Sequence, residues 1–260
     1  MQDRVISSTN NPVVKTLADL QSTDGRRRQG MFLVEGRRAI DGFIVNGWTP
    51  IGTLLGLANA RPDNWPEAES YRLSEPVWRK ISRAATPSEY GALFSLPPSI
   101  DPDEALAEEP SLALVGVSDP GNLGTLMRSA LAFSWRQLLL IGGVDPFAPK
   151  VIAASAGALP ALRIRRCPLN YDPQILAAQG QLLALVPRGG SAPAQVKLGS
   201  LPILAVGSEA HGLPAAWLEC ASSKVTLPMA PGVESLNAAM AASIACWALS
   251  PAVDHQSPKD

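Results

Sequence analysis

Three loops in the second half of the sequence carry polar side chains at spacings that suit binding or catalysis. The first follows an aliphatic run and contains Asn122, Gly124 and Arg128. Asn122 is a residue type that caps helix N-termini, and Gly124 lets another group approach the helix closely. Arg128 follows Gly124 by four residues, so both lie on the same helix face one turn apart. The loop fits two interpretations: a capped helix with an arginine that reaches solvent, or a functional site that uses the guanidinium.

The second loop places a carboxylate between two glycines. Gly207 and Gly212 bracket Glu209 directly after an aliphatic run. Gly207 at a strand end permits close backbone approach to a ligand, and Glu209 can accept hydrogen bonds from an arginine or from hydroxyl groups. The alternative is an ordinary turn between a strand and a helix with an acid on the surface. His211 in the same loop has no second histidine or cysteine at metal-binding spacing, so we expect a polar loop residue.

The third loop runs from an apolar Leu-Pro-Met sequence that includes Leu227 and Met229 into an alanine-rich segment. Ser235 can cap the helix that this segment predicts. Asn237 is poorly suited to a helix interior, so near the helix start it can serve a polar site. The alternative is a capped helix whose apolar neighbours belong to the core.

Several other kinds of site are excluded by the sequence. No GK[ST] follows the first loop and no GxGxxG is present, which excludes the usual phosphate-binding loops. Two histidines and three scattered cysteines supply neither a zinc-finger ligand set nor a disulfide framework, so we predict no metal, reduced thiols and a cytoplasmic protein. No apolar run is long enough to span a membrane, and no signal segment is evident. The net charge of −1 excludes a globally basic coat but permits a local basic face.

The elements that must position these loops follow an alternating pattern. Aliphatic runs predict strands at 112–117, 137–141, 162–166, 182–186, 203–206 and 224–227. The intervening segments predict helices at 122–133, 149–157, 172–178, 214–219 and 235–249. This alternation predicts an α/β domain with a mostly parallel sheet covered by helices on both faces. Such sheets bind ligands at the carboxyl ends of their strands, which is where the three loops stand.

An acidic, proline-rich segment, 97–110, divides the chain. Its four prolines and five acids, without a basic residue, predict a solvated linker. It separates a smaller N-terminal α/β domain, 1–96, from the domain at 111–250, which a tail at 251–260 follows.

The N-terminal domain is locally basic. Arg26, Arg27 and Arg28 stand in what the sequence predicts as a polar loop, and Arg37 and Arg38 open a helical segment. These arginines are either solvated surface residues or a patch that contacts RNA phosphates. Arg163, Arg165 and Arg166 either extend such a face or form the solvated end of a strand.

Taken together and in this order, the three loops resemble the SpoU (TrmH-like) family of RNA ribose 2′-O-methyltransferases in the SPOUT superfamily. The motifs that carry the resemblance are Asn122-x-Gly124-x-x-x-Arg128, Gly207-Ser208-Glu209-x-x-Gly212-Leu213, and Pro228-Met229 with Ser235-Leu236-Asn237. They cover roughly residues 112–249. The N-terminal part resembles a small ribosomal-protein-like RNA-binding domain through Ser8-x-Asn10-Asn11-Pro12, Phe32-x-Val34-Glu35-Gly36-Arg37-Arg38 and Ala85-Thr86-Pro87-x-x-x-Gly91.

The resemblance implies a fold, a donor and roles for named residues. It implies a C-terminal trefoil knot, a homodimer, S-adenosylmethionine as methyl donor and RNA as substrate, most closely ribosomal RNA. The residues that would line the donor pocket are Gly207, Leu227, Met229 and Leu236. Arg128 would act at the ribose 2′-hydroxyl as its base or as its activator. The residues that would orient that hydroxyl or Arg128 are Asn122, Glu209, Ser235 and Asn237. Because an arginine rarely loses its proton, the hypothesis for Arg128 is electrostatic activation.

The sequence departs from the family pattern at two positions and leaves other functions open. Ala153 stands where many relatives have arginine, and Ala210 replaces a common glycine. One alternative keeps the chemistry but takes transfer RNA as substrate. A second is an RNA-binding ribosome assembly factor without turnover. A third, an ordinary doubly wound nucleotide-binding enzyme, lacks its glycine motif.

Overall fold

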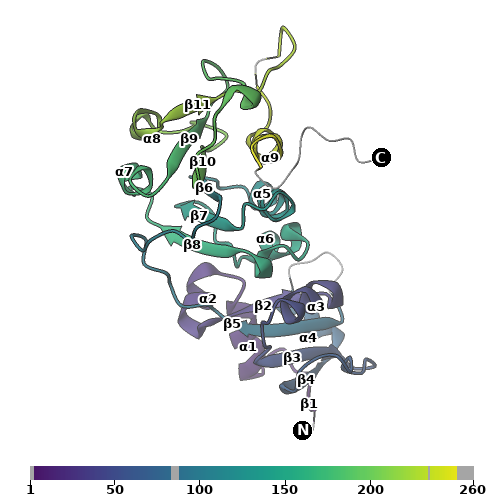
Figure 1. The fold of residues 1–260 in the computed structure, drawn as a ribbon. Helices are drawn as coiled ribbons and strands as arrows, with labels where there is room; N and C mark the ends of the chain where they lie inside the picture. Colours follow the sequence, from purple (N-terminus) through teal and green to yellow (C-terminus); the bar gives the residue numbers. More distant parts are fainter. Residues whose placement is uncertain (1–2, 83–87, 234, 251–260) are drawn as a thin grey trace. The chain divides into compact units, whose positions relative to one another are not determined.

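The computed structural model describes residues 3–82, 88–233 and 235–250. The chain forms two compact units, of which unit 1 comprises residues 1–98 with 145–161, and unit 2 comprises residues 99–144 with 162–260. Both are drawn in Figure 1, and each is described here by itself. The Ala85-Thr86-Pro87 motif and the predicted tail at 251–260 lie outside the described residues.

Unit 2 is built on a six-stranded sheet, counted over the described residues, in the order β11-β9-β10-β6-β7-β8. Its strands are β6 (Ser111–Val115), β7 (Gln137–Ile141), β8 (Arg163–Cys167), β9 (Gln181–Leu185), β10 (Pro202–Val206) and β11 (Ser223–Val225). All neighbouring pairs are parallel. This confirms the predicted α/β unit with a mostly parallel sheet.

Helices cover both faces of this sheet, as Figure 1 shows. On one face lie α7 (Pro173–Ala177) and α8 (Ala215–Cys220), whose Leu176 and Trp217 pack with inward residues of the strands such as Ala113 and Leu182. On the other face α5 (Pro120–Ala132) packs against α9 (Ala238–Ala248). A sheet buried on both faces explains why its strands read as continuous aliphatic runs.

Two helix starts differ from the sequence-based expectation. Helix α5 begins at Pro120, and its cap is Asp119, whose carboxylate accepts the Asn122 backbone N–H at 2.7 Å. Helix α9 begins at Ala238 and is capped by Asn237, so Ser235 is not its cap. Asn122 and Ser235 were each placed at a cap from residue type alone. A cap also needs extended backbone and a side-chain oxygen in reach of the first free N–H groups, which Asp119 and Asn237 provide.

The acidic segment is docked on unit 2 and is not the free linker that its composition predicts. The buried Arg165 guanidinium donates to the carbonyls of Pro102 at 3.4 Å, Glu104, and Ala105 at 3.1 Å. The Tyr171 hydroxyl also donates to the Pro102 carbonyl at 3.0 Å. Burial raises the pKa of Tyr171 to about 12, so this phenol stays protonated as a donor. Four of the five acids are exposed while the backbone is held, and Arg165 is unavailable as an RNA contact.

Unit 1 contains a five-stranded mixed sheet in the order β1-β4-β3-β5-β2, counted within the part of the chain described. Its strands are β1 (Arg4–Ile6), β2 (Met31–Glu35), β3 (Gly52–Gly56), β4 (Glu69–Leu73) and β5 (Tyr90–Ser95). Its helices are α1 (Pro12–Asp19), α2 (Thr23–Gln29), α3 (Arg37–Val45), α4 (Glu75–Ile81) and α6 (Pro149–Ser155), with a 3₁₀ turn at Leu159–Ala161. The triple arginine therefore lies on helix α2, where the sequence predicts a loop.

Residues 145–161 complete the core of unit 1. The Phe147 ring lies 4.8 Å from the Phe32 ring, centroid to centroid, and Phe32 also contacts Phe43 and Phe94. The Trp48 indole N–H donates to the Pro160 carbonyl at 3.2 Å. The N-terminal core thus depends on a segment far along the chain.

None of the helices within the described residues is long and apolar enough to cross a membrane. Over the same residues, no group of three or more His, Cys, Asp or Glu side chains is placed to hold a metal ion. The cysteines Cys167, Cys220 and Cys246 are free thiols.

Candidate functional site

A pocket of about 500 Å³ lies in unit 2 at the carboxyl ends of β9 and β10. The loops after β10 and β11 and the first turn of α9 complete its wall. Its lining residues are Leu185, Val186, Pro187, Val206, Gly207, Ser208, Glu209, Gly212, Leu227, Met229, Ser235, Leu236, Asn237, Ala238 and Ala241. The volume falls in the range of small-molecule sites, and the wall is mainly apolar with a few polar groups, as such sites usually are.

All four residues predicted to line a donor pocket are in this lining. They are Gly207, Leu227, Met229 and Leu236. Leu227 is buried, while Met229 and Leu236 are half-buried, so both leave surface for a ligand.

The backbone turn at Gly207 requires a glycine, independently of any ligand in the pocket. A Cβ atom at this position would lie 2.1 Å from the carbonyl carbon of Gly212. The backbone turns back here, and the Gly212 N–H donates to the Ser208 carbonyl at 2.9 Å. Glycine therefore permits the tight turn that presents the following residues, Ser208 and Glu209, to the pocket.

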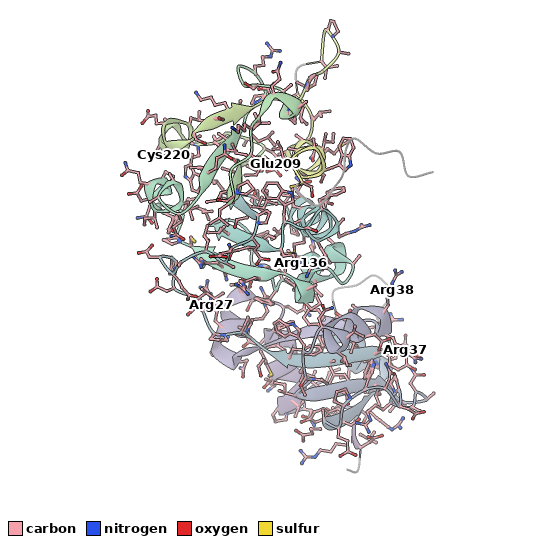
Figure 2. The ribbon with its side chains drawn as sticks, in the orientation of Figure 1. Arg27, Arg37, Arg38, Arg136, Glu209 and Cys220 are labelled. Carbon is pink, nitrogen blue, oxygen red and sulfur yellow. The ribbon has the colours of Figure 1, made fainter. Side chains whose placement is uncertain are left out.

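Three of the predicted polar residues form one hydrogen-bonded chain. The Asn122 Nδ2 donates to Glu209 Oε1, and the Asn237 Nδ2 donates to Asn122 Oδ1 at 3.4 Å. Asn237 Oδ1 in turn accepts the backbone N–H groups of Ala239 at 2.9 Å and Met240 at 3.1 Å. Asn122 lies in the first turn of α5, Asn237 caps α9, and Glu209, which Figure 2 labels in unit 2, lies in the loop after β10. We call this set the amide relay: Asn122, Glu209 and Asn237.

The other two predicted catalytic residues stand apart from the relay. Ser235 is exposed and lines the pocket. Arg128 is exposed on α5, is not in the pocket lining of its own chain, and has no hydrogen bond or ion pair among the described residues. Its neighbour Ser129 donates to Ser243 of α9 at 2.7 Å, so Arg128 belongs to the helix that packs against α9.

Part of the lining was not predicted from the sequence. Leu185 is the last residue of β9, and Val186 and Pro187 follow it; the sequence predicts a strand at 182–186 but not its place in the wall. The missing information was strand order, because β9 neighbours β10 only in the folded sheet. Ala238 and Ala241 belong to the alanine-rich segment that the sequence predicts as a helix, but that prediction did not place them in the wall.

Arg26, predicted to bind RNA, is a structural residue. Its side chain is 2% exposed, and its Nη2 and Nε donate to Asp145 Oδ2 at 2.6 and 3.1 Å. Its Nη1 also donates to the Leu20 carbonyl at 2.8 Å. A guanidinium that is buried and saturated in this way cannot reach an RNA phosphate, so the prediction for Arg26 is wrong.

The other four predicted RNA-binding arginines are exposed on unit 1, and three of them are labelled in Figure 2. Arg28 pairs with Asp19 at 2.7 Å, and the hydrogen bond from Arg28 lowers the pKa of that carboxyl. Arg37 lies 3.9 Å from Asp41, a loose pair on the surface of α3. Arg27 and Arg38 have no hydrogen bond or ion pair within the part of the chain that the structure describes. These two are the cations of the set most available to an anionic partner.

Comparisons with known proteins agree on the kind of molecule that this chain is similar to. The family described as SpoU rRNA Methylase matches residues 109–247, and the MRM3-like substrate binding domain matches residues 11–92. An uncharacterized tRNA/rRNA methyltransferase of Synechocystis is 32% identical over 92% of this chain and 90% of its own length. The 23S rRNA (guanosine(2553)-2′-O)-methyltransferase RlmP of Bacillus subtilis is 27% identical over 94% of this chain and 98% of its own.

A solved structure has a similar fold. The AdoMet-bound rRNA methyltransferase from Sinorhizobium meliloti superposes with a TM-score of 0.83 at 25% identity, covering 96% of this chain and 98% of that one.

Proposed function

The chain belongs to the SpoU rRNA Methylase family, and from that premise we propose that it transfers a methyl group from S-adenosylmethionine to a ribose 2′-hydroxyl of ribosomal RNA. The observation that carries the proposal is the pocket of about 500 Å³ with the amide relay at its edge. An apolar cavity suits the donor, while the relay and an exposed arginine supply the polar groups that a hydroxyl nucleophile needs.

The residues present fit the methyl donor. The pocket volume suits a nucleoside with a short side chain, and its strand-end wall of Leu185, Val186 and Val206 is apolar. When bound, the donor supplies a methyl group activated by a sulfonium. Gly207, Leu227, Met229 and Leu236 hold it in this proposal, through backbone groups and apolar surface.

The chain's own residues prepare the sugar hydroxyl. A ribose hydroxyl is a weak nucleophile, so it must be held in line, lose its proton and be stabilised as negative charge grows on the oxygen. The amide relay and Ser235 orient the hydroxyl. Arg128 stabilises the developing charge as a permanent cation.

Ribosomal RNA is favoured over transfer RNA as the substrate. Residues 11–92 match a substrate-binding domain, and the Bacillus relative that spans the same length is named for 23S rRNA. Arg27 and Arg38 in unit 1, with Arg28 and Arg37, provide the phosphate contacts in this proposal. The RNA substrate and the free thiols both favour the cytoplasm.

The proposal includes a homodimer and a knotted C-terminal segment. Met240, Ile244 and Trp247 form an apolar stripe on α9 with exposures of 56%, 41% and 48%. Their spacing places them on one helix face, and a second copy of the chain would bury that face. The trefoil knot of the family is supported by the way the loops after β10 and β11 and the start of α9 close around one pocket.

A methyl-transfer assay tests the function. Deproteinised total RNA is incubated with the protein and donor labelled in the methyl group, and the modified nucleotide is mapped. Label on a ribose 2′-oxygen of ribosomal RNA is the expected result. Label on transfer RNA instead would identify transfer RNA as the substrate. Donor binding in calorimetry without transfer to naked RNA or ribosomal particles identifies a non-catalytic assembly factor. Absence of donor binding overturns the proposal.

A further inference from the structure

We propose that Asp145 couples the two units of the chain, so that RNA bound by unit 1 tightens the binding of the methyl donor in unit 2. The inference rests on the proposed function and deepens it, because it adds a regulation of the same pocket. Asp145 and Arg26 are positioning residues in this inference, since neither lines the pocket.

The coupling begins at a buried ion pair in unit 1. The Arg26 side chain is 2% exposed and the Asp145 side chain 8%, and the guanidinium donates twice to Asp145 Oδ2, at 2.6 and 3.1 Å. The other carboxylate oxygen, Oδ1, accepts the Phe147 N–H at 3.1 Å. One carboxylate therefore joins helix α2 to the turn that leads into α6.

Stability alone does not require charges at this position. Removing a guanidinium and a carboxylate from water is costly, and an apolar pair of similar volume often stabilises a core as well or better. What the ion pair adds is a single geometry, because the planar guanidinium must meet the carboxylate at fixed angles. The Arg26–Asp145 pair thus fixes where Asp145 lies relative to α2.

The next step follows the backbone from unit 1 into unit 2. Asp145 opens the segment of unit 1 that follows Val144 of unit 2, so a peptide bond joins the units here. The Val144 N–H donates to the Val117 carbonyl at 3.0 Å. Gly143 has a φ of 75°, and a Cβ atom on it would lie 2.2 Å from the same carbonyl oxygen. The loop after β7 is therefore packed tightly on the loop after β6. We call these contacts the Asp145 tie: Arg26, Asp145, Val144 and Val117.

The loop after β6 contacts the wall of the pocket. A Cβ atom on Gly116, the residue before Val117, would lie 3.7 Å from the Cβ atom of Ser208. Ser208 belongs to the loop after β10 and lines the pocket. Van der Waals contact at this distance means that a displaced Val117 loop disturbs the pocket wall. The Asp145 tie therefore ends at the donor site.

The RNA end of the tie is helix α2. Arg27 follows Arg26 on this helix, is exposed, and is one of the cations proposed to contact RNA phosphates. A phosphate bound there holds α2 and favours the state in which the ion pair is formed. A donor in the pocket favours the same state, because it packs against the loop that contains Ser208. Two ligands that favour one state strengthen each other, and each must raise the affinity of the other by the same factor.

The first variant breaks the tie at the ion pair. Arg26→Met together with Asp145→Asn removes both charges at once, so neither is left buried without its partner. The side-chain volumes stay similar, and the new amide oxygen can still accept the Phe147 N–H. Arg27 remains in place to bind RNA.

The second variant breaks the tie in unit 2 and leaves the ion pair unchanged. Gly143→Ala forces a Cβ atom against the Val117 carbonyl oxygen. Its matched control is Gly47→Ala. Gly47 has a similar φ of 83°, but a Cβ atom there meets nothing within 4 Å beyond its chain neighbours.

The first measurement is the Kd of S-adenosylhomocysteine for the full chain, by equilibrium dialysis with and without saturating deproteinised ribosomal RNA. This compound is the donor without its methyl group, so it binds but cannot react. In the wild type and in Gly47→Ala, RNA is expected to lower the Kd about 5-fold or more, which is the lower end of ordinary coupling. In the double variant and in Gly143→Ala the factor should fall below about 2, while the Kd without RNA stays within about 3-fold of the wild type.

The second measurement needs no variant. Hydrogen exchange of the wild-type protein is followed with and without ribosomal RNA, in the absence of donor. The amide of Val144 should exchange at least about 3-fold more slowly with RNA, because its bond to Val117 opens less often.

RNA that leaves the wild-type Kd or the Val144 exchange rate unchanged overturns the inference, and so does full coupling in the double variant. An equal loss of coupling in Gly47→Ala and Gly143→Ala also overturns it, because strain anywhere in the chain would then have the same effect. Failure of the wild type to bind S-adenosylhomocysteine or to methylate RNA is a different result, because it overturns the proposed function. An active enzyme without coupling contradicts only the Asp145 tie.

Discussion

Arg128 has a free, permanent charge on an exposed position of α5, and that charge is the property that the reaction needs from it. Replacing Arg128 by Ala removes the cation without disturbing a contact in the described structure, because the guanidinium has none there. We expect turnover to fall at least about 100-fold, the typical cost of removing an electrostatic stabiliser of an oxyanion. The donor Kd should stay within a factor of two.

Arg136 supplies the matched control for this prediction. It is an exposed arginine of unit 2 that lies outside the pocket lining, and it is labelled in Figure 2. The activity of Arg136→Ala should match the wild type. Full activity in Arg128→Ala, or an equal loss in both variants, would contradict a specific role for Arg128.

Substitutions at two neighbouring arginines of α2 are expected to have different effects, one on stability and the other on RNA affinity. Arg26→Ala leaves Asp145 as a buried charge without its ion-pair partner, and breaking such a pair costs about 3 kcal/mol or more of unfolding free energy. Arg27→Ala removes only an exposed cation, so its stability should not change. Instead its RNA affinity should fall, with the slope of log Kd against log salt reduced by about one.

Urea unfolding and RNA binding at several salt concentrations measure both effects. A stable Arg26→Ala protein with weaker RNA binding would show that Arg26 acts on RNA after all. The two residues also show that the sequence alone could not tell which arginine of the run is buried. Three consecutive arginines look alike in the sequence, but on a helix their side chains point in different directions. The ion-pair partner of Arg26, Asp145, lies 119 residues further along the chain.

At the scale of elements, the sheet and helices of unit 2 could be predicted because each strand is buried on both faces. The strand β7 was predicted with its observed bounds, and β10 within one residue. The first residue of each helix was harder to predict, since Asp119 and Asn122 are equally good cap residues by type. The site was likewise only partly predictable. Sequence motifs identified Asn122, Glu209 and Asn237, whereas the end of β9 joins the pocket wall only through the order of strands in the folded sheet.

The acidic segment shows how a local composition can mislead about an element. Its prolines and acids predict free linker, yet Arg165 binds three of its carbonyls. We expect Arg165→Ala to release residues 99–106, because three charge-assisted hydrogen bonds are lost at once. Limited proteolysis should then cut this segment at least about 10-fold faster, since cleavage needs local opening.

Arg163→Ala is the control for this prediction, because Arg163 is an exposed residue of the same strand β8. Equal cleavage rates in the two variants would mean that the Arg165 hydrogen bonds do not hold the segment.

At the scale of the whole molecule, the apolar stripe on α9 calls for a partner surface. A helix with Met240, Ile244 and Trp247 half exposed on one face is unusual for a monomer, since such faces are normally buried. We expect Ile244→Glu to convert the proposed homodimer to monomer, because it introduces a charge at the centre of the stripe. Light scattering after size-exclusion chromatography measures the mass, and Val45→Glu, at an exposed apolar position of unit 1, should remain a dimer.

The proposed dimer would also give Arg128 a place to act. It is absent from its own pocket lining and is exposed on α5, the helix that packs against α9, so we expect it to serve the pocket of the second copy. The test mixes two inactive chains, Arg128→Ala and a variant with a blocked donor pocket, Met229→Trp. If Arg128 acts across the dimer, each mixed dimer has one complete site, formed by the pocket of the first chain and the arginine of the second. Random mixing should then restore about a quarter of wild-type activity, because half the dimers are mixed and each has one of two sites. If Arg128 serves its own pocket, no mixed dimer contains a complete site, and the mixture stays as inactive as its parents.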